Sequence, residues 1–232
     1  MNLRYGRRYM LSVIATPIGN LGDITLRAIE TLKKCDAIVC EDTRVTGMLL
    51  KHLEIPKKEL ISFHCYSDDG KLTMILKRLK EGAHMALASD AGTPGISDPG
   101  FALVSKARAE GIAIEAVPGC SAVIAALSIS GLPVHHFRYL GFLPLKKGRK
   151  TLIESFADSK ETIIFYESVH RIERTLLELV ATLEHEPERR IVIAREITKM
   201  HEEVITTNVK ELSSIAKALT KKGEFVVMVG PM

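Results

Sequence analysis

The chain has 232 residues, of which 46% are hydrophobic and 26% are charged, and its net charge is +4 at pH 7. This composition excludes a disordered, fibrous or disulfide-built protein and is typical of a globular enzyme with one large or two modest domains. The 32 basic residues nearly balance the 28 acidic ones, so strong attraction to phosphate requires a local basic patch.

Two further features bear on where the protein works. The four cysteines are irregularly spaced, match neither a metal site nor a disulfide framework, and indicate a reducing compartment, by default the cytoplasm. The first apolar run is broken at Pro17, too early for a targeting segment. The apolar stretch 112–134 is interrupted by Gly, Pro and Glu, so we expect no membrane association.

In the first half, short apolar runs alternate with amphipathic stretches, which predicts strand–helix units around a mostly parallel sheet. The expected strands are Leu11–Thr16, Ala37–Glu41, Leu60–His64, His84–Ser89 and Ile112–Val117. Apolar residues at helical spacing after Asp23 predict a helix with Asp23 as its N-cap. Another helix is predicted to begin with Asp98 as N-cap and Pro99 at its first position, and to stop at Gly111.

The second half shows less regular alternation. After a helix of small residues at 121–130, the expected strands are Phe137–Leu143, Thr162–Tyr166, Ile191–Arg195, Glu203–Thr207 and Phe225–Val229. The short interval between Arg195 and Glu203 suggests an antiparallel hairpin, and therefore a mixed sheet. We predict an N-terminal α/β domain over 1–118 and a C-terminal α/β domain over 119–232.

Two loops carry the chemical signal. The first, 16–23, joins a strand to a helix through small residues but is neither a dinucleotide-binding glycine motif nor a P-loop, and a tight turn explains it equally well. The second, 89–100, follows a buried strand at the sheet edge where ligands bind in open α/β folds. Its glycines allow close backbone approach. Asp98 could serve only as a helix cap, but capping and ligand contact are compatible, and we favour a binding loop.

Together with the small-residue turn 118–122, these loops carry a resemblance. The chain resembles the ribosomal small-subunit RNA methyltransferases of the tetrapyrrole methylase superfamily, over nearly everything from Leu11 to Gly230. The supporting motifs are TPIGNLGD from Thr16, EDTR from Glu41, SDAGTPGISDPG from Ser89, GFLP from Gly141, FYES-x-HR from Phe165 and RE-x-TK-x-HE from Arg195.

The resemblance implies a class III methyltransferase fold, in which two α/β domains enclose S-adenosylmethionine in the cleft between them. It implies 2'-O-methylation of a cytidine ribose in 16S ribosomal RNA, within the small subunit and near the decoding centre. It also suggests a homodimer. No metal is expected. By motif, the cofactor contacts are Pro17, Asp90, Gly92, Thr93, Ile96, Ser97, Asp98, Ser121, Ala122, Leu143 and, beside the adenine, Val229.

The acceptor hydroxyl must lose its proton at or after methyl transfer, so a base or proton-accepting network is expected. The catalytic candidates follow two predicted strands and are Asp42, Arg44 and Glu167. On spacing alone, EDTR fits equally well a helix start in which Asp42 or Thr43 caps and Arg44 is solvated. The resemblance favours the catalytic interpretation, but the sequence singles out no base.

Several basic residues are candidates for holding an RNA backbone, which positions RNA without reading its sequence. They are Lys146, Lys147, His170, Arg171, Arg195 and Lys199. Ordinary solvated surface charge is the alternative for each. Many relatives continue past the last strand into a small helical module that has no counterpart here, so we expect RNA docking to be weaker or to be supplied by a dimer partner.

Two other functions remain open. The first is a small-molecule enzyme of the same superfamily that methylates carbon atoms of a porphyrin-like ring. Such enzymes resemble G-x-G-x-G-D-x-x-L-L-T in the first loop, whereas this loop keeps Asp23 without that glycine pattern. The second is a non-catalytic RNA-binding factor, against which the intact cofactor motifs argue.

Overall fold

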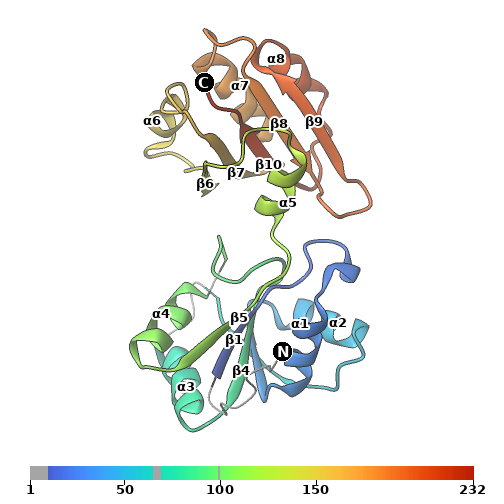
Figure 1. The fold of residues 1–232 in the computed structure, drawn as a ribbon, viewed down its shortest axis with the longest axis vertical. Coiled ribbons are helices and arrows are strands. Elements are labelled where there is room, and N and C mark those ends of the chain that lie inside the picture. Colours follow the sequence, from blue (N-terminus) through green and yellow to red (C-terminus); the bar gives the residue numbers. More distant parts are fainter. Residues whose placement is uncertain (1–9, 65–68, 99) are drawn as a thin grey trace. The chain divides into compact units, whose positions relative to one another are not determined.

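The computed structural model describes residues 10–64, 69–98 and 100–232 (Figure 1). The chain forms two compact units, Met1–Ser121 and Ala122–Met232. Pro99, which the sequence places at the start of a helix, lies outside the described residues.

The N-terminal unit contains a five-stranded sheet in which every neighbouring pair is parallel. Its strands, in the order β3-β2-β4-β1-β5, are β1 (Met10–Ile14), β2 (Ala37–Cys40), β3 (Glu59–Ser62), β4 (His84–Ala88) and β5 (Ala113–Val117). The predicted parallel sheet is confirmed, with strand ends that differ from the prediction by at most two residues.

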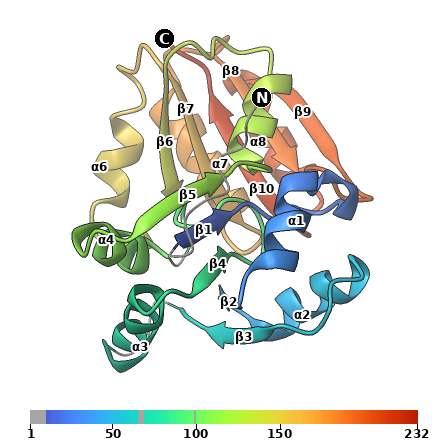
Figure 2. The ribbon, with the colours of Figure 1, turned by 60° about the horizontal axis from the view of Figure 1, so that its bottom comes forward.

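Helices cover both faces of this sheet. Figure 2 shows α1 (Leu26–Lys34) and α2 (Thr43–His52) on one side and α3 (Asp69–Lys80) and α4 (Phe101–Ala109) on the other. Alternate residues of each strand therefore enter different cores: Ile38 and Cys40 pack towards α1, whereas Ala37 and Val39 pack towards α3. Burial on both faces explains why the strands read as continuous apolar runs.

The C-terminal unit contains the predicted mixed sheet. Its strands, in the order β6-β7-β10-β8-β9, are β6 (Phe137–Phe142), β7 (Thr162–Ser168), β8 (Arg190–Arg195), β9 (Glu203–Asn208) and β10 (Glu224–Val229). β6 pairs in parallel with β7, and the other neighbours pair antiparallel, including the predicted β8–β9 hairpin. The core of this unit packs α6 (Arg149–Glu154), α7 (Ile172–Thr182) and α8 (Val209–Ala218) on the sheet, while α5 (Ala122–Ile129) contacts β10.

Both predicted N-caps are wrong. The Asn20 side chain accepts a hydrogen bond from Gly22 N and begins a short 3-10 helix, Leu21–Asp23. Asp23 is therefore the last residue of this turn and does not cap α1. Helix α1 is instead capped by Thr25, whose hydroxyl accepts from Ala28 N at 3.1 Å. Helix α4 has Gly100 as its N-cap, with no side-chain cap, so Asp98 lies outside the helix. Its end is as predicted, with Gly111 at a φ of 72° two residues beyond the last helical residue.

Over residues 10–64, 69–98 and 100–232, every helix is too short or too polar to cross a membrane.

The corrected cap gives a stability test. Replacing Thr25 with Ala leaves the Ala28 amide without its side-chain acceptor, so we expect the N-terminal unit to lose about 1 kcal/mol of unfolding free energy. Urea denaturation followed by circular dichroism measures it. The matched variant Asp23→Ala should change the same free energy by less than about 0.5 kcal/mol. A larger loss for Asp23→Ala would restore Asp23 as the cap.

Candidate functional site

Three loops meet at the carboxyl edge of the parallel sheet. The loop after β1 and the loop after β4 exchange two backbone hydrogen bonds, from Thr16 N to Gly92 O at 2.9 Å and from Gly92 N to Thr16 O at 3.1 Å. The Thr16 hydroxyl also donates to Ser89 O at 3.0 Å. The two loops that the sequence singled out are thus joined directly to one another.

The loop after β5 is attached to the same pair. The Thr93 hydroxyl donates to Cys120 O at 3.1 Å, and Cys120 Sγ contacts Asp23 O at 3.3 Å. Ala15 N donates to Val117 O at 3.2 Å. We call residues 15–23, 89–98 and 117–121 the loop cluster. Its internal bonds fix the backbone of all three loops at one edge of the sheet.

The backbone of the second loop is open to a ligand. Gly92 and Gly95 each have a φ of 82°, which a side chain strongly disfavours, and Ser97 adopts a φ of 62°. A Cβ at Gly92 would lie 3.4 Å from Ile18 and 3.8 Å from Cys120 O, whereas at Gly95 it would meet nothing within 4 Å. Gly92 therefore serves the packing of the loops, and Gly95 leaves backbone uncovered.

The predicted cofactor residues of the N-terminal unit differ in exposure. Pro17 and Gly92 are buried within the cluster, while Asp90, Thr93, Asp98 and Ser121 are half-buried. Ile96 is 49% exposed and Ser97 is also exposed. Ala122, the first residue of the C-terminal unit, is half-buried. The loop cluster thus combines a fixed framework with exposed apolar and hydroxyl groups.

The predicted contacts in the C-terminal unit are less accessible. Leu143 is 2% exposed and Val229 is fully buried, and both side chains belong to the core under α6, α7 and α8. A ligand contact at either residue would therefore use main-chain atoms. The expectation that the adenine lies beside Val229 on the last strand stays a prediction.

An acidic cavity of about 420 Å³ lies at the ends of β2, β3 and β4. It is lined by Glu41, Asp42, Thr43, Arg44, Ser62, His64 and Asp90. Burial raises the pKa of the Glu41 carboxyl, and the nearby Asp90 carboxylate raises it further. Asp90 Oδ1 also accepts from Asp42 N at 3.1 Å, which ties the cavity to the loop cluster.

Asp42 and Arg44 form a local pair. Asp42 is the N-cap of α2 and accepts from Arg44 N at 2.8 Å and from the Arg44 guanidinium at 2.6 to 3.1 Å. These hydrogen bonds lower the pKa of Asp42 to about 2. The Arg44 side chain is 87% exposed. The helix-start interpretation of this motif is therefore confirmed, and a carboxylate of such low pKa is a weak base.

Sequence reasoning missed the residue beside this pair. Glu41 belongs to the EDTR motif but is not among the candidates from the sequence, and neither are Ser62 and His64, which line the same cavity. The available signal was position, because Glu41 and His64 each end a predicted parallel strand, where side chains converge on one sheet edge.

Glu167 is buried and bonded to other side chains, whereas a catalytic base must be accessible to its substrate. Its side chain is fully buried at the end of β7, accepting from Arg171 Nε at 2.9 Å and from the Thr175 hydroxyl at 2.7 Å. Arg149, itself buried, bonds Thr175 and Glu178 at 2.7 Å each. We call Arg149, Glu167, Arg171, Thr175 and Glu178 the buried ion cluster. Glu167 has no free face for a substrate proton.

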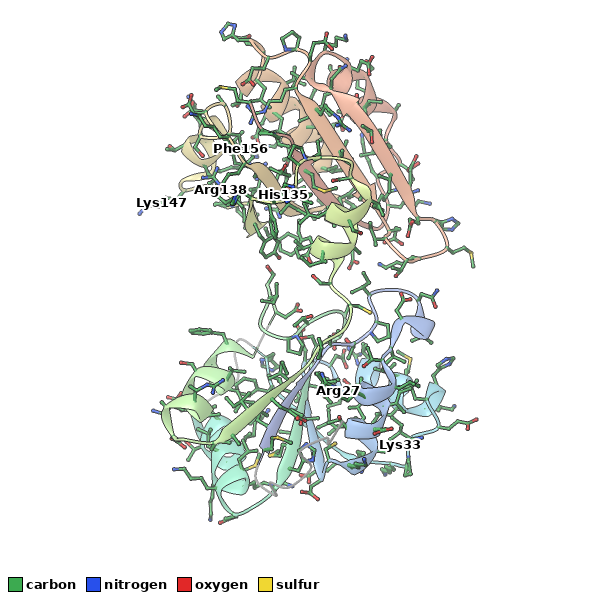
Figure 3. All side chains as sticks on the ribbon, viewed as in Figure 1. Arg27, Lys33, His135, Arg138, Lys147 and Phe156 are labelled. Atoms are coloured by element: carbon green, nitrogen blue, oxygen red, sulfur yellow. The ribbon has the colours of Figure 1, made fainter. Side chains whose placement is uncertain are left out.

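The candidate RNA contacts fall into two groups. Lys146, Lys147 and His170 are exposed, and Lys147 extends away from the loop before α6 (Figure 3). The other two surface candidates are already paired: Arg195 with Glu203 at 3.0 Å, and Lys199 with Glu196 and Glu224 at 2.9 Å each. Arg171 belongs to the buried ion cluster. In the described part of the chain, no group of three or more His, Cys, Asp or Glu side chains could hold a metal ion.

A parallel sheet covered on both faces, with joined loops at its carboxyl edge, is the arrangement in which open α/β proteins bind ligands. The family model of the tetrapyrrole (corrin/porphyrin) methylases matches residues 10–213. The chain belongs to this family of methyltransferases.

Two curated relatives match nearly the whole chain. The ribosomal RNA small subunit methyltransferase I of Halalkalibacterium halodurans is 45% identical over 220 residues, which are 94% of this chain and 75% of the relative. The protein of the same name in Haemophilus influenzae is 45% identical over 223 residues, or 95% of this chain and 78% of the relative.

Solved structures confirm the two-unit α/β fold. Uroporphyrin-III C-methyltransferase from Thermus thermophilus, complexed with S-adenosylhomocysteine, matches with a TM-score of 0.65 and 18% identity, over 97% of both chains. At this identity the likeness concerns the fold alone.

The acidic cavity yields a titration test. We expect the Glu41 carboxyl to titrate above the ordinary glutamate pKa of 4.5 in ¹³C-detected NMR, while Asp42 titrates at about 2. Asp90→Asn removes a neighbouring negative charge, so the pKa of Glu41 should fall. Arg44→Ala should raise the pKa of Asp42 and serves as the matched change on the other carboxyl. A Glu41 pKa at or below 4.5 would contradict the described burial.

Proposed function

We propose that the protein transfers a methyl group from S-adenosylmethionine to the ribose 2'-oxygen of a cytidine in 16S ribosomal RNA, within the small subunit and near its decoding centre. The acceptor is supported by the names of relatives that share 45% of residues over at least 94% of the chain. The cofactor is supported by the family and by the ligand in the related fold. The ribose position rests on the motifs of the sequence.

The observation that carries the proposal is the hydrogen-bonded loop cluster. S-adenosylmethionine presents hydroxyls, a carboxylate and two positively charged groups, so its site needs backbone donors, hydroxyls and carboxylates. The cluster supplies uncovered backbone at Gly95, a hydroxyl at Ser97 and carboxylates at Asp90 and Asp98. In the N-terminal unit we assign the cofactor contacts to the cluster residues named from the sequence. In the C-terminal unit, Leu143 and Val229 are assigned contacts through their main-chain atoms.

When bound, S-adenosylmethionine supplies an electrophilic methyl group. The chain must orient the acceptor oxygen and receive its proton. We assign the proton to Glu41, whose pKa is raised by burial, because a carboxylate of higher pKa is the stronger base. Glu41 would accept the proton of the acceptor hydroxyl, while the cofactor would supply the methyl group and leave as S-adenosylhomocysteine. Asp42 and Arg44 brace the start of α2 at the cavity wall.

Methylation of a tetrapyrrole carbon is the main alternative, since a solved neighbour of similar fold is named for that reaction. The more similar relatives are named for ribosomal RNA. The exposed Lys146, Lys147 and His170 provide positive charge for a phosphate backbone.

Calorimetric titration with S-adenosylmethionine tests the cofactor site. We expect one site per chain, with an affinity that Thr93→Val lowers about fivefold, because the bond to Cys120 O is lost with little change in shape. Thr73→Val is the matched control, since the Thr73 hydroxyl donates to Asp69 O within α3 at 2.8 Å. Absence of binding to the wild-type protein would refute cofactor use, and equal losses in both variants would place the site elsewhere.

A methyl-transfer assay on unmodified small-subunit particles tests the acceptor. We expect 2'-O-methylcytidine by mass spectrometry of the digested RNA. Glu41→Gln should lower the transfer rate constant by about 10² to 10⁴ while cofactor binding persists. Transfer only to a tetrapyrrole would select the alternative enzyme. Particle binding without any transfer would select a non-catalytic RNA-binding factor.

A further inference from the structure

We propose that Arg171 is a positioning residue for the main chain of Leu143 and Pro144, not a contact for RNA phosphate. The inference rests on the proposed function, since it takes this segment as part of the cofactor site. It replaces the RNA-binding role that the sequence suggested for Arg171 with a different one.

The carbonyl groups of the segment are held by two guanidinium groups. Arg171 Nη1 donates to Leu143 O at 3.1 Å, and Arg149 Nη1 donates to Pro144 O at 3.2 Å. Leu143 directly follows β6, and Pro144 cannot donate a backbone hydrogen bond. Two successive carbonyls bonded to fixed cations leave this stretch of backbone little freedom to rotate.

Glu167 determines where the Arg171 guanidinium lies. Glu167 Oε1 accepts from Arg171 Nε at 2.9 Å and from its neighbour Ser168 N at 2.7 Å. Arg171 Nε also lies 3.3 Å from the Ser168 hydroxyl. The guanidinium is therefore oriented on its Nε edge by a buried carboxylate, which directs its Nη1 to Leu143 O.

Thr175 links the two guanidinium groups through the same carboxylate. Its hydroxyl donates to Glu167 Oε2 at 2.7 Å and accepts from Arg149 Nη2 at 2.7 Å. Arg149 Nε and Nη2 donate to Glu178 Oε2 at 2.9 and 2.7 Å. The buried Arg149 and the half-buried Arg171 are thus paired with Glu167 and Glu178, as charges removed from water require.

Arg171 is poorly placed to hold phosphate. Its side chain is 21% exposed, its Nε bonds a carboxylate and a hydroxyl, and its Nη1 bonds a carbonyl. Arg174, one turn further along α7, is 69% exposed and contacts Glu178 at 2.8 Å. If α7 held an RNA backbone by charge, Arg174 would be the better-exposed cation. The arrangement around Arg171 is that of a support for backbone.

A lysine at position 171 separates the two roles. Lysine keeps the positive charge that phosphate requires but cannot place one donor on Glu167 and another on Leu143 O in the fixed geometry of a guanidinium. We expect Arg171→Lys to weaken S-adenosylmethionine binding about tenfold or more in calorimetry. The KM for small-subunit particles at saturating cofactor should stay within about twofold of the wild-type value.

The control and a second variant keep the test decisive. Arg174→Lys should leave cofactor affinity unchanged. Because a poorly paired Glu167 charge would destabilise the single variant, the double variant Glu167→Gln with Arg171→Met removes both charges of the pair and should show the same loss of affinity. Thermal unfolding of each variant reports the folded fraction, and affinities are compared only where the protein is folded.

The outcomes distinguish this inference from the proposed function. Failure of the wild-type protein to bind S-adenosylmethionine contradicts the proposed function, and this inference with it. Cofactor affinity that both Arg171 variants retain overturns the inference alone, whatever the KM for particles. Weaker cofactor binding in both variants with an unchanged KM for particles supports it.

Discussion

Strand β1 pairs in parallel with β4 on one side and β5 on the other, with Ile14 opposite Ala88 and Val117. The three strands therefore end at the same level of the sheet, and the loops that follow them start side by side. The bonds between Thr16 and Gly92 and between Thr93 and Cys120 can form only because of this register. A shift of β4 by one residue would reverse the faces of its side chains and separate the loops.

Two adjacent carboxyl groups at this edge have opposite pKa shifts. Asp42 is solvent-accessible and accepts several hydrogen bonds from Arg44, so its charged form is stabilised. Glu41 is partly desolvated beside Asp90, so its charged form is disfavoured. The pKa of Glu41 is higher in the folded than in the unfolded protein. The contribution of Glu41 to stability is therefore lost as the pH rises from the unfolded pKa through the folded pKa. At neutral pH the fold therefore holds a carboxylate at some cost in stability, as is usual for groups with a chemical role.

The sequence contained enough information for the architecture because the strands are buried on one or both faces and read as apolar runs. The motifs also located the loop cluster, because they follow parallel strands, and parallel strands end at one edge of the sheet. The starts of helices were harder to predict. Asn20 caps a short turn, and α1 begins only after Thr25. The spacing of apolar residues does not show which of several polar side chains will bond the first free amides of a helix. The environment of Glu167 could not be predicted, because Arg149 and Glu178, 29 positions apart, meet only through the packing of α6 on α7.

The buried ion cluster has a consequence for how the family can vary. Arg149, Arg171, Glu167 and Glu178 are balanced as a group, so replacing one charged member leaves an unpaired charge in the interior of the C-terminal unit. Such a replacement is tolerated only when another member changes with it. Natural sequences should therefore change these positions together.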